Sequence, residues 1–154
     1  RGGRPPPFGS DLPGSTEQIL HPEDFARGQQ DAPRRVEVLV EDGWIRLYED
    51  TLGELELGIL LETVGASRTY AAGWGGDRYV LLGDGDGHRS LAWFGVWDTE
   101  AQRDRFILEL EPHLSAFPKQ ASLTASEIGG LPSTLLLVGD VPDVTASVRD
   151  VDPE

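Results

Sequence analysis

The sequence predicts an α+β fold, in which a mostly antiparallel sheet carries two main helices packed on one face. A pattern of strand, strand and helix occurs over residues 36–64 and again over residues 78–114, and such a repeat favours a layered sheet with its helices on one side. The chain has 154 residues, of which 38% are hydrophobic, so it is long enough to bury a core. We expect a single α+β domain over residues 15–154.

The first 14 residues differ in composition from the rest of the chain. Eight of them are Gly or Pro, which cannot pack a core, so residues 1–14 are predicted to be a flexible linker or arm. Ser15 and Gln18 have the spacing of a capping box. A short helix is expected from there to about Leu20, followed by a polar loop over residues 26–34.

Regular structure is predicted to begin near Arg35. Residues 36–40 alternate as a strand does, residues 41–43 are a turn signal, and residues 44–48 are expected to return as the second strand of a hairpin. Thr51 and Glu54 then form a capping box, and the helix they begin should end at Gly65 in a left-handed conformation. Its expected buried face is formed by Leu52, Leu55, Ile59 and Leu60, widened by Leu57, Leu61 and Val64.

The next segment contains three predicted strands. Residues 69–72 are expected to form a short one. Residues 73–77 contain three glycines and are predicted to be a loop, because glycine destabilises regular elements. Residues 78–82 and 90–97 are expected to pair across a hairpin turn at residues 83–87.

The second main helix is predicted to begin with a capping box at Thr99 and Gln102. Its expected buried stripe consists of Phe106, Ile107, Leu110 and Leu114. The pattern of residues 119–132 leaves their structure open. Two last strands are expected over residues 133–138 and 144–148, around a turn at Gly139 and Asp140.

The chain is strongly acidic. Asp and Glu number 27 against 13 Lys and Arg, which gives a formal net charge of -14, and Lys119 is the single lysine. This charge opposes binding to nucleic acids and to anionic lipid, which both need cations. A halophilic protein and an acidic protein from a GC-rich genome both fit the composition. No apolar run reaches the roughly 18 residues that cross a bilayer, so no transmembrane segment is predicted.

The segment Trp74-Gly75-Gly76-Asp77-Arg78 is the best candidate for a ligand-binding loop. Glycine lets a ligand approach the backbone closely, and an indole offers a large apolar face. A structural interpretation is also open, in which Trp74 fills the end of the core while Asp77 and Arg78 fix the loop by pairing.

No metal or cofactor site is predicted. His21, His88 and His113 stand in different elements, and a histidine site needs convergent ligands. Asp84 and Asp86 could offer oxygens to calcium, but a loop of the EF-hand type needs a glutamate where this chain has Gly95. We interpret these acids as part of a hairpin turn. The chain has no cysteine, which excludes disulfides, thiol catalysis and cysteine-type zinc sites.

No catalytic residues are predicted. The chain lacks the Gly-x-Ser-x-Gly motif of a nucleophile elbow, and its Gly83, Gly85 and Gly87 lead into a strand, not into the helix of a dinucleotide site. Trp93 and Trp97 are expected on one face of their strand, with Phe94 on the other. At least one of these faces must belong to the core, and the other would be a docking surface if it were exposed.

Four segments of the chain resemble a family of known proteins. They are Ser15–Phe25, Asp50–Leu55, Ala71–Tyr79 and Val96–Glu100, and they resemble motifs of bacterial and archaeal surface proteins related to gluzincin-type metallopeptidases. In that family a peptidase-like domain with a His-Glu-x-x-His metal site precedes the module that carries these motifs. This chain contains no His-Glu-x-x-His, so no zinc ligand or catalytic residue can be transferred to it.

The resemblance implies an accessory role. It predicts a non-catalytic domain of a secreted or cell-surface protein, often a lipoprotein, that packs on an upstream peptidase-like domain of the same polypeptide or orients substrate for it. Its expected location is extracellular or at the cell surface. The alternative is an independent ligand-binding module that uses the loop around Trp74.

Overall fold

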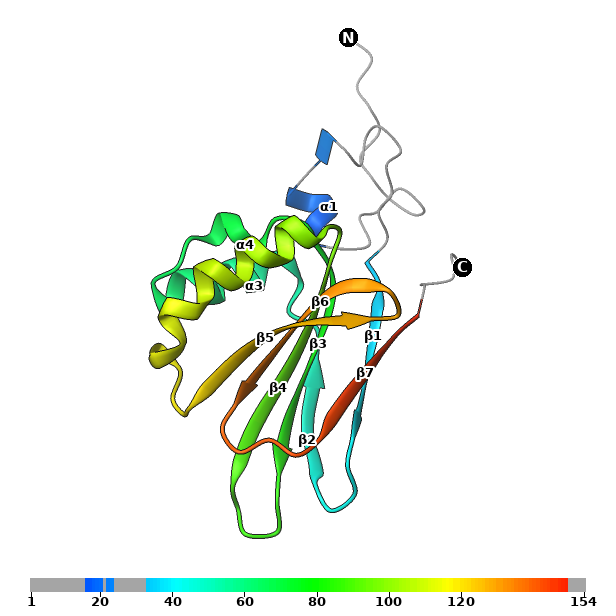
Figure 1. The fold of residues 1–154 in the computed structure, drawn as a ribbon, viewed down its shortest axis with the longest axis vertical. Coiled ribbons are helices and arrows are strands. Elements are labelled where there is room, and N and C mark those ends of the chain that lie inside the picture. The colour runs from blue at the N-terminus through cyan, green and yellow to red at the C-terminus, as the bar shows by residue number, and fades with distance from the viewer. Residues whose placement is uncertain (1–15, 21, 24–32, 150–154) are drawn as a thin grey trace.

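A computed structural model of the chain describes residues 16–20, 22–23 and 33–149. It contains two antiparallel sheets and two main helices (Figure 1), which confirms the predicted α+β class. The short helix α1 spans Thr16–Leu20, as expected. The predicted arm over residues 1–14, the cap at Ser15, most of the loop over residues 26–34 and His21 lie outside the described residues.

The larger sheet has five strands in the order β2-β3-β4-β6-β5, and each pairs with its neighbour antiparallel. The smaller sheet pairs β1 with β7, also antiparallel. The strands are β1 (Arg35–Val40), β2 (Ile45–Asp50), β3 (Trp74–Gly83), β4 (Arg89–Trp97), β5 (Ala121–Ile128), β6 (Leu131–Val138) and β7 (Val144–Arg149). The other helices are α3 (Gly53–Val64), α4 (Glu100–Leu110) and the 3-10 helices η2 (Arg68–Ala71) and η3 (Glu111–Ala116).

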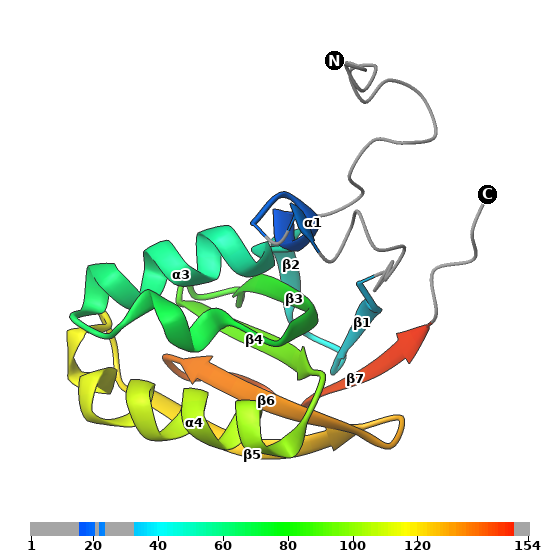
Figure 2. The ribbon, with the colours of Figure 1, turned by 90° about the horizontal axis from the view of Figure 1, so that it is seen from above.

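The five-stranded sheet is the middle of three layers. Both main helices cover one of its faces (Figure 2), and the β1–β7 sheet covers part of the other. Trp93 and Trp97 pack in the core under the helices, whereas Phe94 packs in the core under β1 and β7. The predicted division of these three aromatic residues is therefore confirmed, and both faces of β4 belong to a core.

The predicted hairpin over residues 36–48 is wrong. β1 pairs with β7 from Arg35 opposite Arg149 to Val40 opposite Val144, while β2 pairs with β3. The apolar face of β1 explains the difference, because Val36 and Val38 are buried against the second face of the large sheet. A hairpin with β2 would have left that face uncovered.

Two shorter predictions also need correction, and one segment that was left open is now assigned. The expected strand over residues 69–72 is the 3-10 helix η2. The expected loop over residues 73–77 is mostly strand, because β3 begins at Trp74 and accommodates its glycines with a bulge between Trp74 and Gly76. The unassigned residues 119–132 contain β5, which reaches β6 through a turn at Gly129 and Gly130, both with positive φ.

The two helices follow the sequence to different degrees. In α4 the Thr99 hydroxyl accepts from the Gln102 N–H, as predicted, and Phe106 and Leu110 are buried. In α3 the left-handed end at Gly65 is confirmed, with φ of 93°. The predicted buried stripe of α3 is wrong in part, since Ile59 is 51% exposed. Its buried residues are Gly53, Glu54, Leu57, Gly58 and Leu61, because η2 packs beside Gly58.

Across the described residues, no helix combines the length and apolar character that crossing a membrane requires.

Candidate functional site

Asp77 is a buried polar residue of the core whose carboxylate accepts four hydrogen bonds. It is 2% exposed. Its Oδ1 accepts from the backbone N–H of Gly53 and from the Trp74 indole, both at 3.0 Å. Its Oδ2 accepts from the backbone N–H of Leu52 at 2.9 Å and from the Trp93 indole at 2.8 Å. Each oxygen thus accepts hydrogen bonds from two N–H groups, so all acceptor sites of the carboxylate are occupied.

Asp77 also replaces the predicted cap of α3. The Thr51–Glu54 capping box does not form: α3 starts after Leu52 with no side-chain cap of its own, and the Thr51 hydroxyl donates to the Asp77 carbonyl. The carboxylate reaches the first N–H groups of the helix from β3, where a negative charge is favourable. Burial raises the pKa of the Asp77 carboxyl above its ordinary value, and the four N–H donors oppose that rise.

The predicted binding segment over residues 74–78 is held by internal contacts. Trp74 is 2% exposed and packs in the core under the helices. A Cβ at Gly76 would lie 2.3 Å from the Arg34 carbonyl oxygen, so the glycine is required by the close approach of another backbone. Arg78 pairs with Glu49 at 3.1 Å. These contacts give the segment a structural role, while ligand binding by it stays a prediction.

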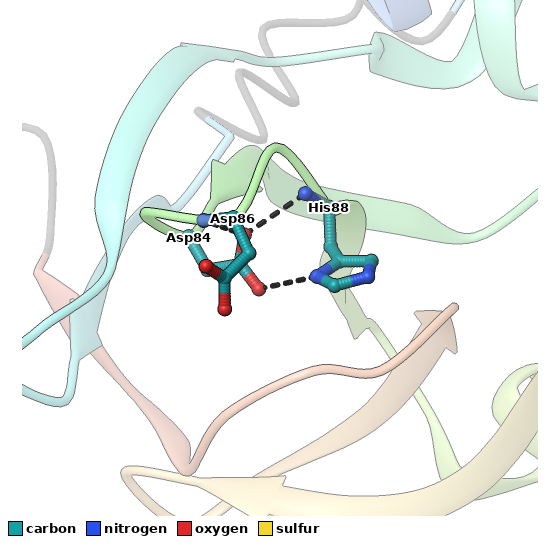
Figure 3. A group of neighbouring side chains, drawn as sticks. All are labelled: Asp84, Asp86 and His88. Carbon is teal, nitrogen blue, oxygen red and sulfur yellow. Dashed lines mark hydrogen bonds and ion pairs between the residues drawn. The ribbon is translucent and has the colours of Figure 1, made fainter.

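The turn between β3 and β4 brings Asp84, Asp86 and His88 together (Figure 3). Asp84 Oδ1 accepts from the N–H groups of Asp86 and His88, each at 2.9 Å, and Asp84 Oδ2 lies 2.7 Å from His88 Nδ1. Burial tends to raise the pKa of the Asp84 carboxyl, but the hydrogen bonds from His88 and Asp86 outweigh burial and hold it below its ordinary value. These hydrogen bonds stabilise the hairpin turn that contains the three residues.

The structure also locates two of the three histidines that were considered as metal ligands. The Asp84–His88 pair was not predicted, although its i, i+4 spacing was visible in the sequence. His113 lies in η3, where its Nδ1 would be 3.4 Å from a Cβ at Gly65. The structure thus places His113 at the end of α3 and His88 in the β3–β4 turn.

A cavity of about 360 Å³ opens between the helix layer and the large sheet. We call it the apolar groove. Its walls are α3, the segment after η3, and the facing strands β3, β4 and β6. Leu60, Leu81 and Leu91 are half-buried, so the groove is open to solvent. The lining residues are Leu52, Leu60, Tyr79, Leu81, Arg89, Ser90, Leu91, Trp93, Phe117, Pro118, Lys119, Leu136 and Val138.

One end of the apolar groove is polar and cationic. Arg89, Ser90 and Lys119 meet around Gly139, since a Cβ there would contact the Lys119 side chain at 3.1 Å, the Arg89 carbonyl oxygen at 3.3 Å and Ser90 Cβ at 3.4 Å. The Lys119 ammonium donates to the Arg89 carbonyl. Ser90 is 3% exposed, and its hydroxyl has no hydrogen-bond partner.

A family model described as a domain of unknown function (DUF8575) matches residues 41–130 of the chain. The match runs from the residues before β2 to the end of β5, so it includes Asp77 and most of the groove lining. No curated protein and no solved structure shows a significant match.

Proposed function

We propose, since the chain belongs to the DUF8575 family of domains of unknown function, that it is a non-catalytic binding module whose site is the apolar groove. The observation that carries this proposal is the groove itself. Its volume of about 360 Å³ lies at the lower end of the range of small-molecule sites, which are concave and mostly apolar with a few polar groups.

The apolar lining explains why a ligand would bind. Leu52, Leu60, Leu81 and Leu91 are held half-exposed around the cavity by α3 and the sheet. An apolar molecule that displaces water from these side chains is stabilised by roughly 25 cal/mol for each Å² buried. The walls belong to two layers that are fixed by the core, so the groove exists before a ligand arrives.

The hydrogen bonds of two acidic residues, Asp77 and Asp84, support a non-catalytic role. Both oxygens of Asp77 are occupied by N–H donors, and Asp84 is engaged by the backbone and ring of its own turn. A general base needs a free lone pair aimed at a substrate. These two carboxylates serve the fold instead.

The uncharged fluorophore N-phenyl-1-naphthylamine tests the groove directly. We expect it to bind the chain at a single saturable site with increased fluorescence. Leu91 lines the groove from β4, so Leu91→Trp should fill the cavity and weaken probe binding by at least about tenfold. Leu39→Trp makes the same change at a site on β1 that is 64% exposed, and should leave binding unchanged.

Two results would contradict the groove proposal. One is a wild-type chain that binds no probe at all. The other is a Leu91→Trp variant that binds the probe as tightly as Leu39→Trp, with circular dichroism showing that both variants are folded.

The accessory role beside an upstream peptidase-like domain is a second proposal, and the resemblance supports it. Three of the resembling segments meet in the fold: Asp50–Leu55 and Ala71–Tyr79 are joined by the Asp77 hydrogen bonds, and Asp98 of Val96–Glu100 donates its N–H to the Gly73 carbonyl at 3.0 Å. Motifs that share one network are expected to occur together. This supports a common core with the gluzincin-related surface proteins.

The coding sequence upstream of Arg1 tests the accessory role. We expect a His-Glu-x-x-His motif about one domain ahead, together with a secretion signal or lipid anchor on the same polypeptide. An upstream sequence with neither would contradict both the peptidase-like partner and the extracellular or cell-surface location. Turnover of peptides or esters by this chain alone would contradict the non-catalytic role.

A further inference from the structure

The apolar groove carries two cations at one end, although the chain as a whole is strongly acidic. Its net charge is -14, and within the described ranges several arginines face acidic partners, such as Arg78 with Glu49 and Arg149 with Glu37. Arg89 has no acidic partner among the described residues, and the single lysine, Lys119, has none either. Two cations with no acidic partner in the described part of the chain therefore line the same apolar cavity.

The Lys119 ammonium is fixed in place and still has donors to spare. One of its three N–H groups is directed to the Arg89 carbonyl, which leaves two for a ligand. Arg89 is exposed at the start of β4 and lines the groove, and its planar guanidinium suits a carboxylate. Because both cations line the same groove, an anionic group of a ligand bound there is attracted by both of them.

We propose that the ligand of the apolar groove is an amphipathic anion, whose acidic head group lies between Arg89 and Lys119 and whose apolar body lies against the leucines of α3, β3 and β4. This inference rests on the proposed binding function of the groove. It adds the chemical class of the ligand and its orientation. The head group lies at the end of the groove formed by the start of β4 and by the segment between η3 and β5.

Displacement of bound N-phenyl-1-naphthylamine compares ligands that share one apolar chain. We expect decanoate to displace the probe at about fivefold to tenfold lower concentration than 1-decanol, because the exposed cations are partly screened by solvent. Decylammonium should be the weakest of the three. The advantage of decanoate should shrink as NaCl is raised, since salt screens the charges.

The double variant Arg89→Gln, Lys119→Gln should reduce decanoate to the level of decanol and leave decanol unchanged. The matched control is Arg35→Gln, Arg105→Gln, which removes the same charge from two described cations outside the groove lining and should keep the advantage of decanoate.

Failure of this inference differs from failure of the groove proposal. If the probe binds but decanoate and decanol displace it equally, or if the control pair abolishes the difference as fully as the groove pair does, the amphipathic anion is overturned and the groove stands. If the probe does not bind the wild-type chain, the groove proposal itself fails.

Discussion

Asp77→Ala is expected to lower the free energy of unfolding by at least about 4 kcal/mol, because it leaves four N–H groups without an acceptor and each buried unpaired donor costs roughly 1–3 kcal/mol. Two of these donors are the first N–H groups of α3, from Leu52 and Gly53, and two are the indoles of Trp74 and Trp93. The loss thus affects the start of a helix and the core beneath it. Urea unfolding followed by far-ultraviolet circular dichroism measures it.

Asp77→Asn separates hydrogen bonding from side-chain volume. The amide is nearly the same size as the carboxylate, but its NH₂ group would face two N–H donors, and we expect a loss of about 3 kcal/mol. Asp42→Asn removes the same charge in the exposed turn before β2 and should change stability by less than about 0.5 kcal/mol. Equal unfolding midpoints for the two Asn variants would show that Asp77 does not hold α3 and the indoles.

Structural features that depend only on neighbouring residues could be predicted from the sequence. The cap of α4 is local, because the Thr99 hydroxyl accepts from the N–H of Gln102 three residues away, and this half of the predicted capping box is confirmed. The cap of α3 comes from Asp77, which is 25 residues from Leu52 and 24 from Gly53. Thr51 and Glu54 have the spacing of a capping box, but the Thr51 N–H donates to Asp50 Oδ1 and the Thr51 hydroxyl donates to the Asp77 carbonyl. The spacing of residues at the start of a helix cannot reveal a hydrogen-bond acceptor on a strand that is distant in the sequence.

The strand pairings show the same limit at longer range. The alternation of β1 predicted a strand with one apolar face, and Val36 and Val38 are indeed buried. Its partner, however, is β7, with Val36 opposite Val148. A nearby turn favoured β2 as the partner, but the uncovered second face of the large sheet determined the pairing. That face exists only once the five strands have assembled.

The candidate site was predicted least well, for a related reason. The apolar groove is assembled from side chains of α3, β3, β4, β6 and the segment after η3, so no stretch of sequence carries it. Lys119 was conspicuous as the single lysine, but it lay in a segment without a predicted element.

Gly95→Ala is expected to destabilise the chain by about 2–3 kcal/mol, the upper part of the range of about 1–3 kcal/mol that is usual for overpacking a core. A Cβ at Gly95 would lie 2.3 Å from Cη2 and 2.7 Å from Cζ2 of Trp93. The indole cannot move aside easily. It is 2% exposed, packs on Phe106 with ring centroids 5.6 Å apart, and donates its N–H to Asp77 at 2.8 Å.

The same substitution at Gly85 isolates packing from the general effect of replacing glycine. Gly85 lies in the exposed β3–β4 turn, where an added Cβ would have no neighbour within 4 Å and φ is not positive. Gly85→Ala should therefore change stability by less than about 0.5 kcal/mol. Equal effects of the two substitutions in urea unfolding would remove steric crowding at Trp93 as the cause.

A double-mutant cycle tests whether Gly95 acts through the Asp77 network. If crowding at Gly95 displaces the Trp93 indole from its carboxylate, then Asp77→Asn has already lost part of the same interaction. The combined loss in Gly95→Ala, Asp77→Asn should therefore be smaller than the sum of the single losses by at least about 1 kcal/mol. Strict additivity would mean that the space at Gly95 and the hydrogen bonds of Asp77 stabilise the core independently. Coupling would mean that one glycine in β4 makes room for the indole that Asp77 orients, and so supports both the start of α3 and the sheet wall of the apolar groove.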